Sequence, residues 1–221
     1  ALAASVELGH SRKSSITTDY YGRRYDYTEI METISKFDFP FKILKEKELF
    51  KVAADIIAQE KIFGWFQGAS EFGPRALGNR SIMANPSSPC TKYMLDHLMK
   101  CRDRYRPYAP VVIEERAKQY FDIDGDSPVM MRNVKVLDDR LVAVTHCDGT
   151  ARVQTVRESE NNYLYRLLLE VEQTLGFPIL LNTSFNGPGE PIVESPLDAL
   201  NSFAHGYLDY LFIENFLIFR N

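Results

Sequence analysis

The sequence lacks the features that mark membrane and secreted proteins. No apolar run approaches the roughly 18 residues that a membrane-spanning helix requires, and no signal peptide is visible. The three cysteines, Cys90, Cys101 and Cys147, form no Cys-x-x-Cys pair. Such an odd, scattered set suits a reducing compartment. We therefore expect a cytoplasmic protein that makes no contact with a membrane.

Common catalytic and metal-binding motifs are missing as well. The four histidines show no metal-ligand spacing, so we expect no protein-bound metal. The chain has neither a Gly-x-Ser-x-Gly elbow nor a full phosphate loop of the Gly-x4-Gly-Lys-Ser/Thr type. Without a nucleophile and its base, the remaining means of catalysis are positioning and electrostatic stabilisation.

Positive charge is concentrated in one segment. The 221 residues carry a net charge of −4, yet the stretch from Phe72 to Pro110 has seven basic side chains and two acidic ones, a net charge of +5. The basic residues are Arg75, Arg80, Lys92, Lys100, Arg102, Arg104 and Arg106. A basic segment within an acidic chain favours a compact anion over a nucleic acid, whose partners are usually basic as a whole. A phosphorylated small molecule is the expected ligand.

Helical and strand patterns alternate along the chain and predict an α/β domain with a twisted mixed sheet. Residues 1–44 are polar and aromatic with poor periodicity, and we expect an arm; the chain begins with Ala1 rather than Met, so we expect a fragment. The expected strands are 61–67, 111–113, 129–136, 141–146, 149–156, 178–181 and the hairpin 210–213 and 216–219. The expected helices begin at Lys45, at Thr91, at Asn161 and after the N-cap Ser195.

Two basic loops are the first candidates for the site. In the Gly73–Ser81 loop, Gly and Pro fix the backbone while Arg75 and Arg80 offer forked donors to an anion. The alternative is a tight turn whose arginines pair with Glu71 and other surface acids. In the Lys100–Arg106 turn, four cations within seven residues repel one another unless an anion neutralises them; the alternative is a solvated charged turn.

Two polar segments are the next candidates. Arg152 and Gln154 are two apart on an expected strand and so share one face; they line a site or face water. The segment that starts at Asn182 follows a buried strand, the position at which open α/β sheets bind ligands. Ser184 and Asn186 point the same way in extended geometry. They suit a phosphate and an amide-like group, although a lone Ser-x-Asn is also an ordinary turn.

Together these segments resemble the C-terminal domain of the carbamoyltransferase family, the O-carbamoyltransferases of antibiotic and nodulation-factor biosynthesis. The resemblance covers roughly residues 45–221, with residues 1–44 similar to the family's interdomain segment. The motifs that carry it are Glu71–Ile82, Arg106–Pro110, the pair Asp148–Val156 and Leu180–Asn186, and Gly189–Val193.

The resemblance implies a YrdC-like fold, that of the threonylcarbamoyl-adenylate synthases. It also implies an activity: the domain joins ATP and carbamoyl phosphate into carbamoyl-adenylate, with Mg²⁺ brought by the nucleotide. An N-terminal actin-like, metal-binding domain, absent from this chain, then passes the carbamoyl group to a hydroxyl. The sequence does not identify that acceptor or the oligomeric state.

The resemblance also assigns roles to residues. The family's Lys/Arg and Ser-x-Asn signature is similar to Lys100, Arg106, Ser184 and Asn186, which we expect to be catalytic. Arg75 and Arg152 match further anion-holding arginines. With Arg80, Gln154 and Asn182 they form the expected nucleotide-binding set. The pair Asp103-Arg104 replaces a Glu followed by an apolar residue, which leaves the role of Arg104 open.

Two other readings compete. The chain could be a non-catalytic nucleotide- or RNA-binding module of the YrdC-like type, and a steep loss of RNA affinity with salt would favour that reading. It could also be a structural lid for the missing transferase domain. A lid would leave several basic residues facing its interior without an anion, which is costly. The overall acidity argues against nucleic acid as a partner.

Overall fold

The computed structural model describes residues 7–9, 19–101 and 107–220. Within these residues nine strands form one mixed sheet in the order β1-β9-β8-β2-β3-β7-β4-β6-β5. Neighbouring strands are antiparallel except for the parallel pairs β2–β8 and β4–β6. The strands are β1 (Phe41–Ile43), β2 (Phe63–Phe66), β3 (Arg80–Ala84), β4 (Ala109–Ile113), β5 (Arg132–Lys135), β6 (Thr150–Val156), β7 (Ile179–Ser184), β8 (Tyr210–Ile213) and β9 (Phe216–Phe219).

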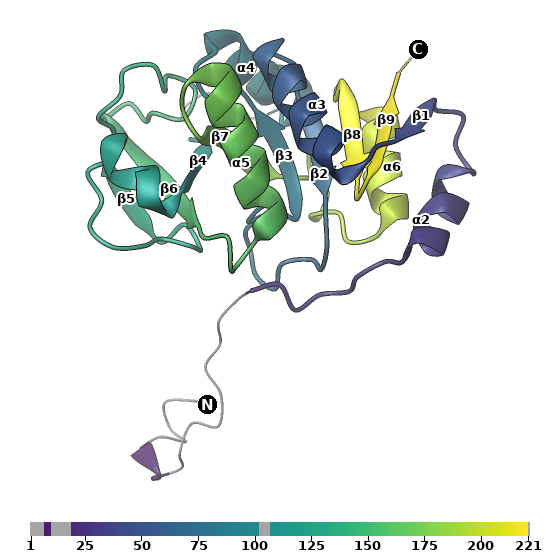
Figure 1. Ribbon diagram of the computed structural model, residues 1–221, viewed down its shortest axis with the longest axis horizontal. Helices are drawn as coiled ribbons and strands as arrows, with labels where there is room; N and C mark the ends of the chain where they lie inside the picture. Colours follow the sequence, from purple (N-terminus) through teal and green to yellow (C-terminus); the bar gives the residue numbers. More distant parts are fainter. Residues whose placement is uncertain (1–6, 10–18, 102–106, 221) are drawn as a thin grey trace.

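Helices cover both faces of this sheet (Figure 1). They are α2 (Tyr27–Ile34), α3 (Glu46–Ala58), α4 (Pro89–Met94), the π-helical turn η1 (Leu95–Met99), the 3-10 helix η2 (Glu114–Gln119), α5 (Asn162–Leu175) and α6 (Pro196–His205). Helices α3 and α5 pack side by side on one face, and their apolar residues form one buried cluster with that face. Helices α2 and α6 and the turn η1 contribute to the cluster on the other face. No helix among the described residues is long and apolar enough to cross a bilayer.

The predicted start of α5 and the predicted N-cap of α6 are confirmed. The Asn161 side chain accepts a hydrogen bond from the Leu164 N–H at the start of α5, and Gly176 ends that helix with a left-handed φ of 80°. Ser195 and Asp198 form a capping box around Pro196 at the start of α6. The hairpin of β8 and β9 is also confirmed.

One predicted strand is wrong. Residues 141–146 form turns: the Leu141 N–H bonds the Asp138 carbonyl, and the Ala143 N–H bonds the Pro86 carbonyl. Leu141, Ala143 and Val144 are nevertheless buried. The alternating apolar residues are buried here, but they belong to an irregular loop. A six-residue apolar pattern does not distinguish such a loop from a strand.

The expected arm contributes two elements to the domain. Its residues from Tyr27 onward form α2, which packs against α6, and β1, which pairs with β9 in register Phe41↔Ile218. Ile30 and Ile34 of α2 are each 1% exposed and belong to the core cluster. The described part of this segment is therefore packed on the sheet.

The sheet topology gathers loops from distant parts of the sequence at one end. Strand β3 runs antiparallel to β7, with Ser81 opposite Ser184, and β4 does the same on the other side, with Ala109 opposite Asn182. Since β6 is parallel to β4, its first residues lie at this same end. The carboxyl end of β7 thus lies between the starts of β3 and β4.

Candidate anion-binding site

Lys100 reaches the end of β7. Its Nζ lies 2.6 Å from the Ser184 carbonyl oxygen, 2.8 Å from the Asn186 carbonyl oxygen and 2.7 Å from Asn186 Oδ1. The side chains that the sequence groups as Lys and Ser-x-Asn are 84 and 86 residues apart in the chain and in direct contact in the fold.

Local structure on both sides produces this contact. The turn η1 ends with the Lys100 N–H bonded to the Leu95 carbonyl, five residues back, which is the wider spacing of a π-helix. Cys101 then takes a positive φ of 45°. On the other side Phe185 is completely buried, so it fixes the two polar residues that flank it.

The Lys100 ammonium is fully engaged in this state. An ammonium has three N–H donors, and three oxygens lie within 2.8 Å of it. The Ser184 hydroxyl donates to Asn186 Oδ1 at 2.7 Å, and Asn186 Nδ2 donates to the Glu190 carbonyl at 2.7 Å. Lys100 therefore supplies positive charge behind Ser184 and Asn186, and the Ser184 hydroxyl is the group that can turn toward an anion.

Gln154 and Asn182 have a different position from the one expected for nucleotide contacts. Both are 1% exposed, and Asn182 Nδ2 donates to Gln154 Oε1 at 2.7 Å. Gln154 Nε2 donates to the Leu77 carbonyl at 2.7 Å, and Asn182 Nδ2 also lies 3.2 Å from the Ala76 carbonyl. This pair holds the loop that carries Arg75, since its polar atoms are directed at the loop backbone.

Arg80 is likewise turned inward. It is completely buried, and its guanidinium donates to five backbone carbonyls at 2.8–3.4 Å. The guanidinium also lies 3.5 Å from the centre of the Phe66 ring. Burial lowers the pKa of Arg80 to about 10, although Glu71 and Glu194 oppose the shift. All five of its N–H groups tie backbone segments together, so the guanidinium is directed into the fold.

Arg75 and Arg152 remain as anion-facing candidates. Arg75 is half-buried in the loop that follows Glu71, and Arg152 is half-buried on β6. The register of β4 with β6 and β7 puts Arg152 level with Asn182, two strands and so about 10 Å across the sheet. Arg106 lies outside the described residues, as do Arg102 and Arg104.

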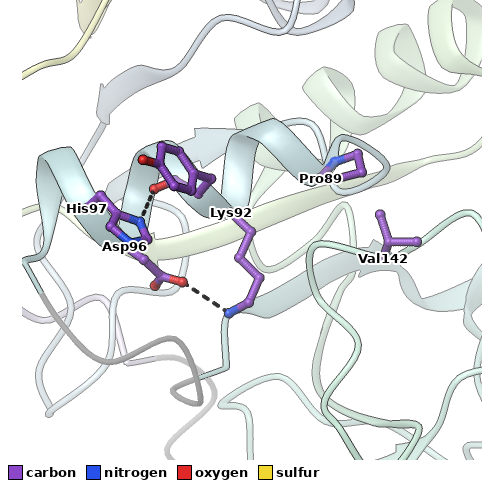
Figure 2. Close-up of a pocket in the computed structure, with 6 residues that line it drawn as sticks. Pro89, Lys92, Asp96, His97 and Val142 are labelled. Carbon is purple, nitrogen blue, oxygen red and sulfur yellow. Dashed lines mark hydrogen bonds and ion pairs between the residues drawn. The ribbon is translucent and has the colours of Figure 1, made fainter.

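Lys92 belongs to a cluster that the sequence reasoning did not identify. Asp96 is 1% exposed; its carboxylate accepts a hydrogen bond from Tyr108 at 2.8 Å and forms an ion pair with Lys92 at 3.3 Å. Figure 2 shows Lys92 directed at Asp96. Both residues line a pocket of about 230 Å³. The i,i+4 spacing of Lys92 and Asp96 was the available signal. Part of the charge of the basic segment is thus neutralised within the fold.

His146 lies close to two of the basic residues. Burial lowers its pKa; Asp148 raises it, and the positive charges of Arg152 and Lys92 lower it further. In its neutral form, the His146 imidazole adds no positive charge to this basic region. Among the described residues, no group of three or more His, Cys, Asp or Glu side chains is arranged to hold a metal ion.

Known proteins resemble this chain over most of its length. The family model for the carbamoyltransferase C-terminus matches residues 54–220. Nodulation protein NolNO of Sinorhizobium fredii is 45% identical over 99% of this chain and 33% of its own length. Nodulation protein NolO of Bradyrhizobium diazoefficiens is 38% identical over 99% of this chain and 41% of its own length.

A third relative carries an enzyme name. The 3'-hydroxymethylcephem-O-carbamoyltransferase of Amycolatopsis lactamdurans is 41% identical over 64% of this chain and 27% of its own length. This chain therefore spans less than half the length of the relatives it matches.

The fold also resembles that of a solved protein. The crystal structure of full-length HypF in its phosphate- and nucleotide-bound form matches 83% of this chain and 23% of HypF, with a TM-score of 0.56 and 16% identity. This likeness concerns the fold alone. It confirms the predicted YrdC-like α/β architecture.

Proposed function

Because the chain belongs to the carbamoyltransferase family through the C-terminal domain of that family, we propose that it binds ATP and carbamoyl phosphate and forms carbamoyl-adenylate. Carbamoyl transfer is the general activity of the family. The identity of the two substrates is the specific part of the proposal. HypF, whose fold is similar, was crystallised with phosphate and nucleotide, which supports ligands of this kind.

The observation that carries the proposal is the contact of Lys100 with Ser184 and Asn186. It gathers a positive charge, a hydroxyl and an amide at the carboxyl end of a buried strand. With Arg75 and Arg152 at the same end of the sheet, the described part of the site offers donors and positive charge but no nucleophile paired with a base. This is the equipment for stabilising a phosphoryl-transfer transition state, which needs little covalent help from the protein.

The chemistry follows from these groups. Water would first hydrolyse carbamoyl phosphate to carbamate and inorganic phosphate. An oxygen of the carbamate would then attack the α-phosphorus of ATP, while the bond between the α-phosphorus and the pyrophosphate oxygen breaks and pyrophosphate leaves. Arg75, Arg106 and Arg152 would hold the anionic groups. Ser184 and Asn186 would orient the carbamoyl group and the α-phosphate, and Lys100 would stabilise the charge that develops beside them. Mg²⁺ would enter with the nucleotide.

The remainder of the longer relatives is the natural place for the second half of the reaction. We propose that an N-terminal actin-like, metal-binding domain of the same polypeptide receives carbamoyl-adenylate and transfers the carbamoyl group to a hydroxyl. Accordingly, this chain should release pyrophosphate from ATP, Mg²⁺ and carbamoyl phosphate but should not carbamoylate an added polyol. Carbamoylation of the polyol would place the transfer site within these 221 residues.

Calorimetry with carbamoyl phosphate and a non-hydrolysable ATP analogue tests the binding directly. Lys100→Met removes the positive charge behind Ser184 and Asn186 and should weaken carbamoyl phosphate binding roughly tenfold to a hundredfold, since opposite charges about 4 Å apart attract by about 1–4 kcal/mol between bulk water and a protein surface. Ser184→Ala removes one neutral donor and should have a smaller effect. Lys118, exposed and paired with Asp124, is the matched control as Lys118→Met. Equal losses at Lys100 and Lys118 would show a diffuse charge effect and contradict the assigned site.

A further inference from the structure

The carboxylate of Glu71 lies inside the loop that carries Arg75. One of its oxygens, Oε1, accepts hydrogen bonds from three backbone N–H groups: Leu77 at 2.6 Å, Asn79 at 2.8 Å and Arg80 at 3.3 Å. The sequence suggested instead that Glu71 pairs with a loop arginine. A carboxylate that accepts several backbone N–H bonds is a strong local anchor, because charge-assisted hydrogen bonds are roughly twice as strong as neutral ones.

The carbonyl side of the same loop is fixed from other directions. The Leu77 carbonyl accepts from the Tyr20 hydroxyl at 3.0 Å and from Gln154 Nε2 at 2.7 Å, and the Ala76 carbonyl accepts from Asn182. Gly73 and Gly78 hold positive φ values of 153° and 107° at either end, conformations that favour glycine. Glu71 is thus the acceptor at the centre of a loop whose outer carbonyls are also bonded.

Arg75 depends on this loop for its placement. Its side chain is half-buried, and among the described residues its guanidinium forms no hydrogen bond or ion pair. A long side chain without such partners keeps rotamer freedom, so the position of its backbone decides which region its charge can reach. The guanidinium of Arg80, by contrast, donates hydrogen bonds to five backbone carbonyls of other residues. The fixed conformation of residues 71–80 therefore determines where the positive charge of Arg75 lies.

We propose that Glu71 is a positioning residue for Arg75: it sets the affinity of the site for the phosphate of carbamoyl phosphate without touching the ligand. The proposal rests on the proposed function for the identity of that ligand. The expected change in anion affinity is opposite to the one that simple electrostatics predicts. Removing a carboxylate near a site for an anion should strengthen anion binding by simple electrostatics, whereas loss of the loop anchor should weaken it.

A double-mutant cycle separates these effects. Glu71→Ala should weaken carbamoyl phosphate binding roughly tenfold in calorimetry. Glu71→Gln keeps an acceptor oxygen and should recover part of that loss. In an Arg75→Ala background, Glu71→Ala should cause no further loss, because the two residues act through one interaction. Glu32→Gln, on the exposed face of α2, controls for the change in net charge.

Three binding results would overturn the proposal: tighter binding by Glu71→Ala, no recovery in Glu71→Gln, or a full additional loss in the Arg75→Ala background. The last would indicate a general structural role. Amide hydrogen exchange provides a readout that needs no ligand. The Leu77 and Asn79 amides should exchange roughly tenfold faster in Glu71→Ala, and unchanged exchange would also overturn the proposal.

The two proposals fail differently. A wild-type chain that does not bind carbamoyl phosphate contradicts the proposed function, and the exchange of the loop amides then decides alone whether Glu71 anchors the loop. A wild-type chain that binds carbamoyl phosphate, with Glu71→Ala unchanged in affinity and exchange, contradicts only the role of Glu71.

Discussion

Glu214 shows how a single buried charge affects the stability of this domain. It follows β8, and its Oε1 accepts the Gly68 N–H at 2.7 Å. Burial raises the pKa of this carboxyl above its ordinary value of 4.5, while the Gly68 N–H and the charges of Arg80 and Arg24 oppose the shift. Because the folded pKa is the higher one, the stability linked to the protonated form is complete below pH 4.5 and is lost as pH rises through the folded pKa.

Glu214→Gln should therefore stabilise the domain increasingly as pH rises. The amide keeps an acceptor for Gly68 but carries no charge to desolvate. We expect the melting temperature of the variant to exceed that of the wild type near about pH 7 and the two to converge near about pH 4. Thermal unfolding across this range measures the difference, with Glu32→Gln as an exposed control. A constant offset at all pH values would show that ionisation of Glu214 is not responsible.

Individual residues were the hardest part of the site to predict. Lys100, Ser184 and Asn186 meet as the grouped motifs indicated. Arg75 and Arg80, in contrast, share one loop and one residue type, yet only Arg80 is completely buried on backbone carbonyls. Sequence alone does not separate them, because the acceptors of Arg80 come from residues as distant as Arg23 and Glu194.

Among the secondary-structure elements, α5 packs directly against the Arg75 loop. A Cβ added at Gly78 would lie 2.4 Å from Leu164 Cδ2 on this helix, and the φ of Gly78 is 107°. Gly78→Ala should therefore destabilise the domain through both strain and overlap. Gly176 is the matched control: its φ is 80°, but a Cβ there meets no atom within 4 Å.

Gly176→Ala should cost about 1–2 kcal/mol, the strain of a left-handed residue. Gly78→Ala should cost more, because repacking of Leu164 adds to a similar strain. Urea unfolding of the two variants gives both values. A smaller effect at Gly78 than at Gly176 would mean that α5 and the loop separate easily.

Chemical signals at the helix ends made α5 and α6 predictable. Helices α5 and α6 begin and end at Asn161, Gly176 and Ser195, whose side chains or backbone conformations are specific to helix ends. The apolar run 141–146 has no such signal. Its burial depends on bonds to residues such as Pro86, which a local pattern does not contain. Helix α2 was also missed, although Asp26 and Glu29 form its capping box.

At the scale of the whole molecule, the first part of the chain completes the sheet. A chain that begins at Lys45, the boundary expected from the sequence, would lose α2 and β1. It would expose the edge of β9 and the core around Phe216, against which Tyr27 and Phe41 lie at ring-centroid distances of 5.2 and 6.1 Å.

We expect this shortened chain to unfold at a lower temperature than the full one and to aggregate through its exposed edge. Removal of residues 1–18 alone leaves both elements in place and serves as the control. Thermal unfolding and light scattering compare the three chains. Equal stability of the chain from Lys45 would show that α2 and β1 are accessory to the fold.

The pairing of β1 with β9 has a consequence for synthesis on the ribosome. Residues 41–43 emerge well before their partners, residues 216–218. Strands β8 and β9 also separate β1 from β2 in the sheet. Strand β1 therefore has no partner strand until residues 216–218 have been synthesised, and at about 5–20 residues per second this delay is on the order of ten seconds or more. During that time the aromatic side chains of α2 and β1 are available to chaperones.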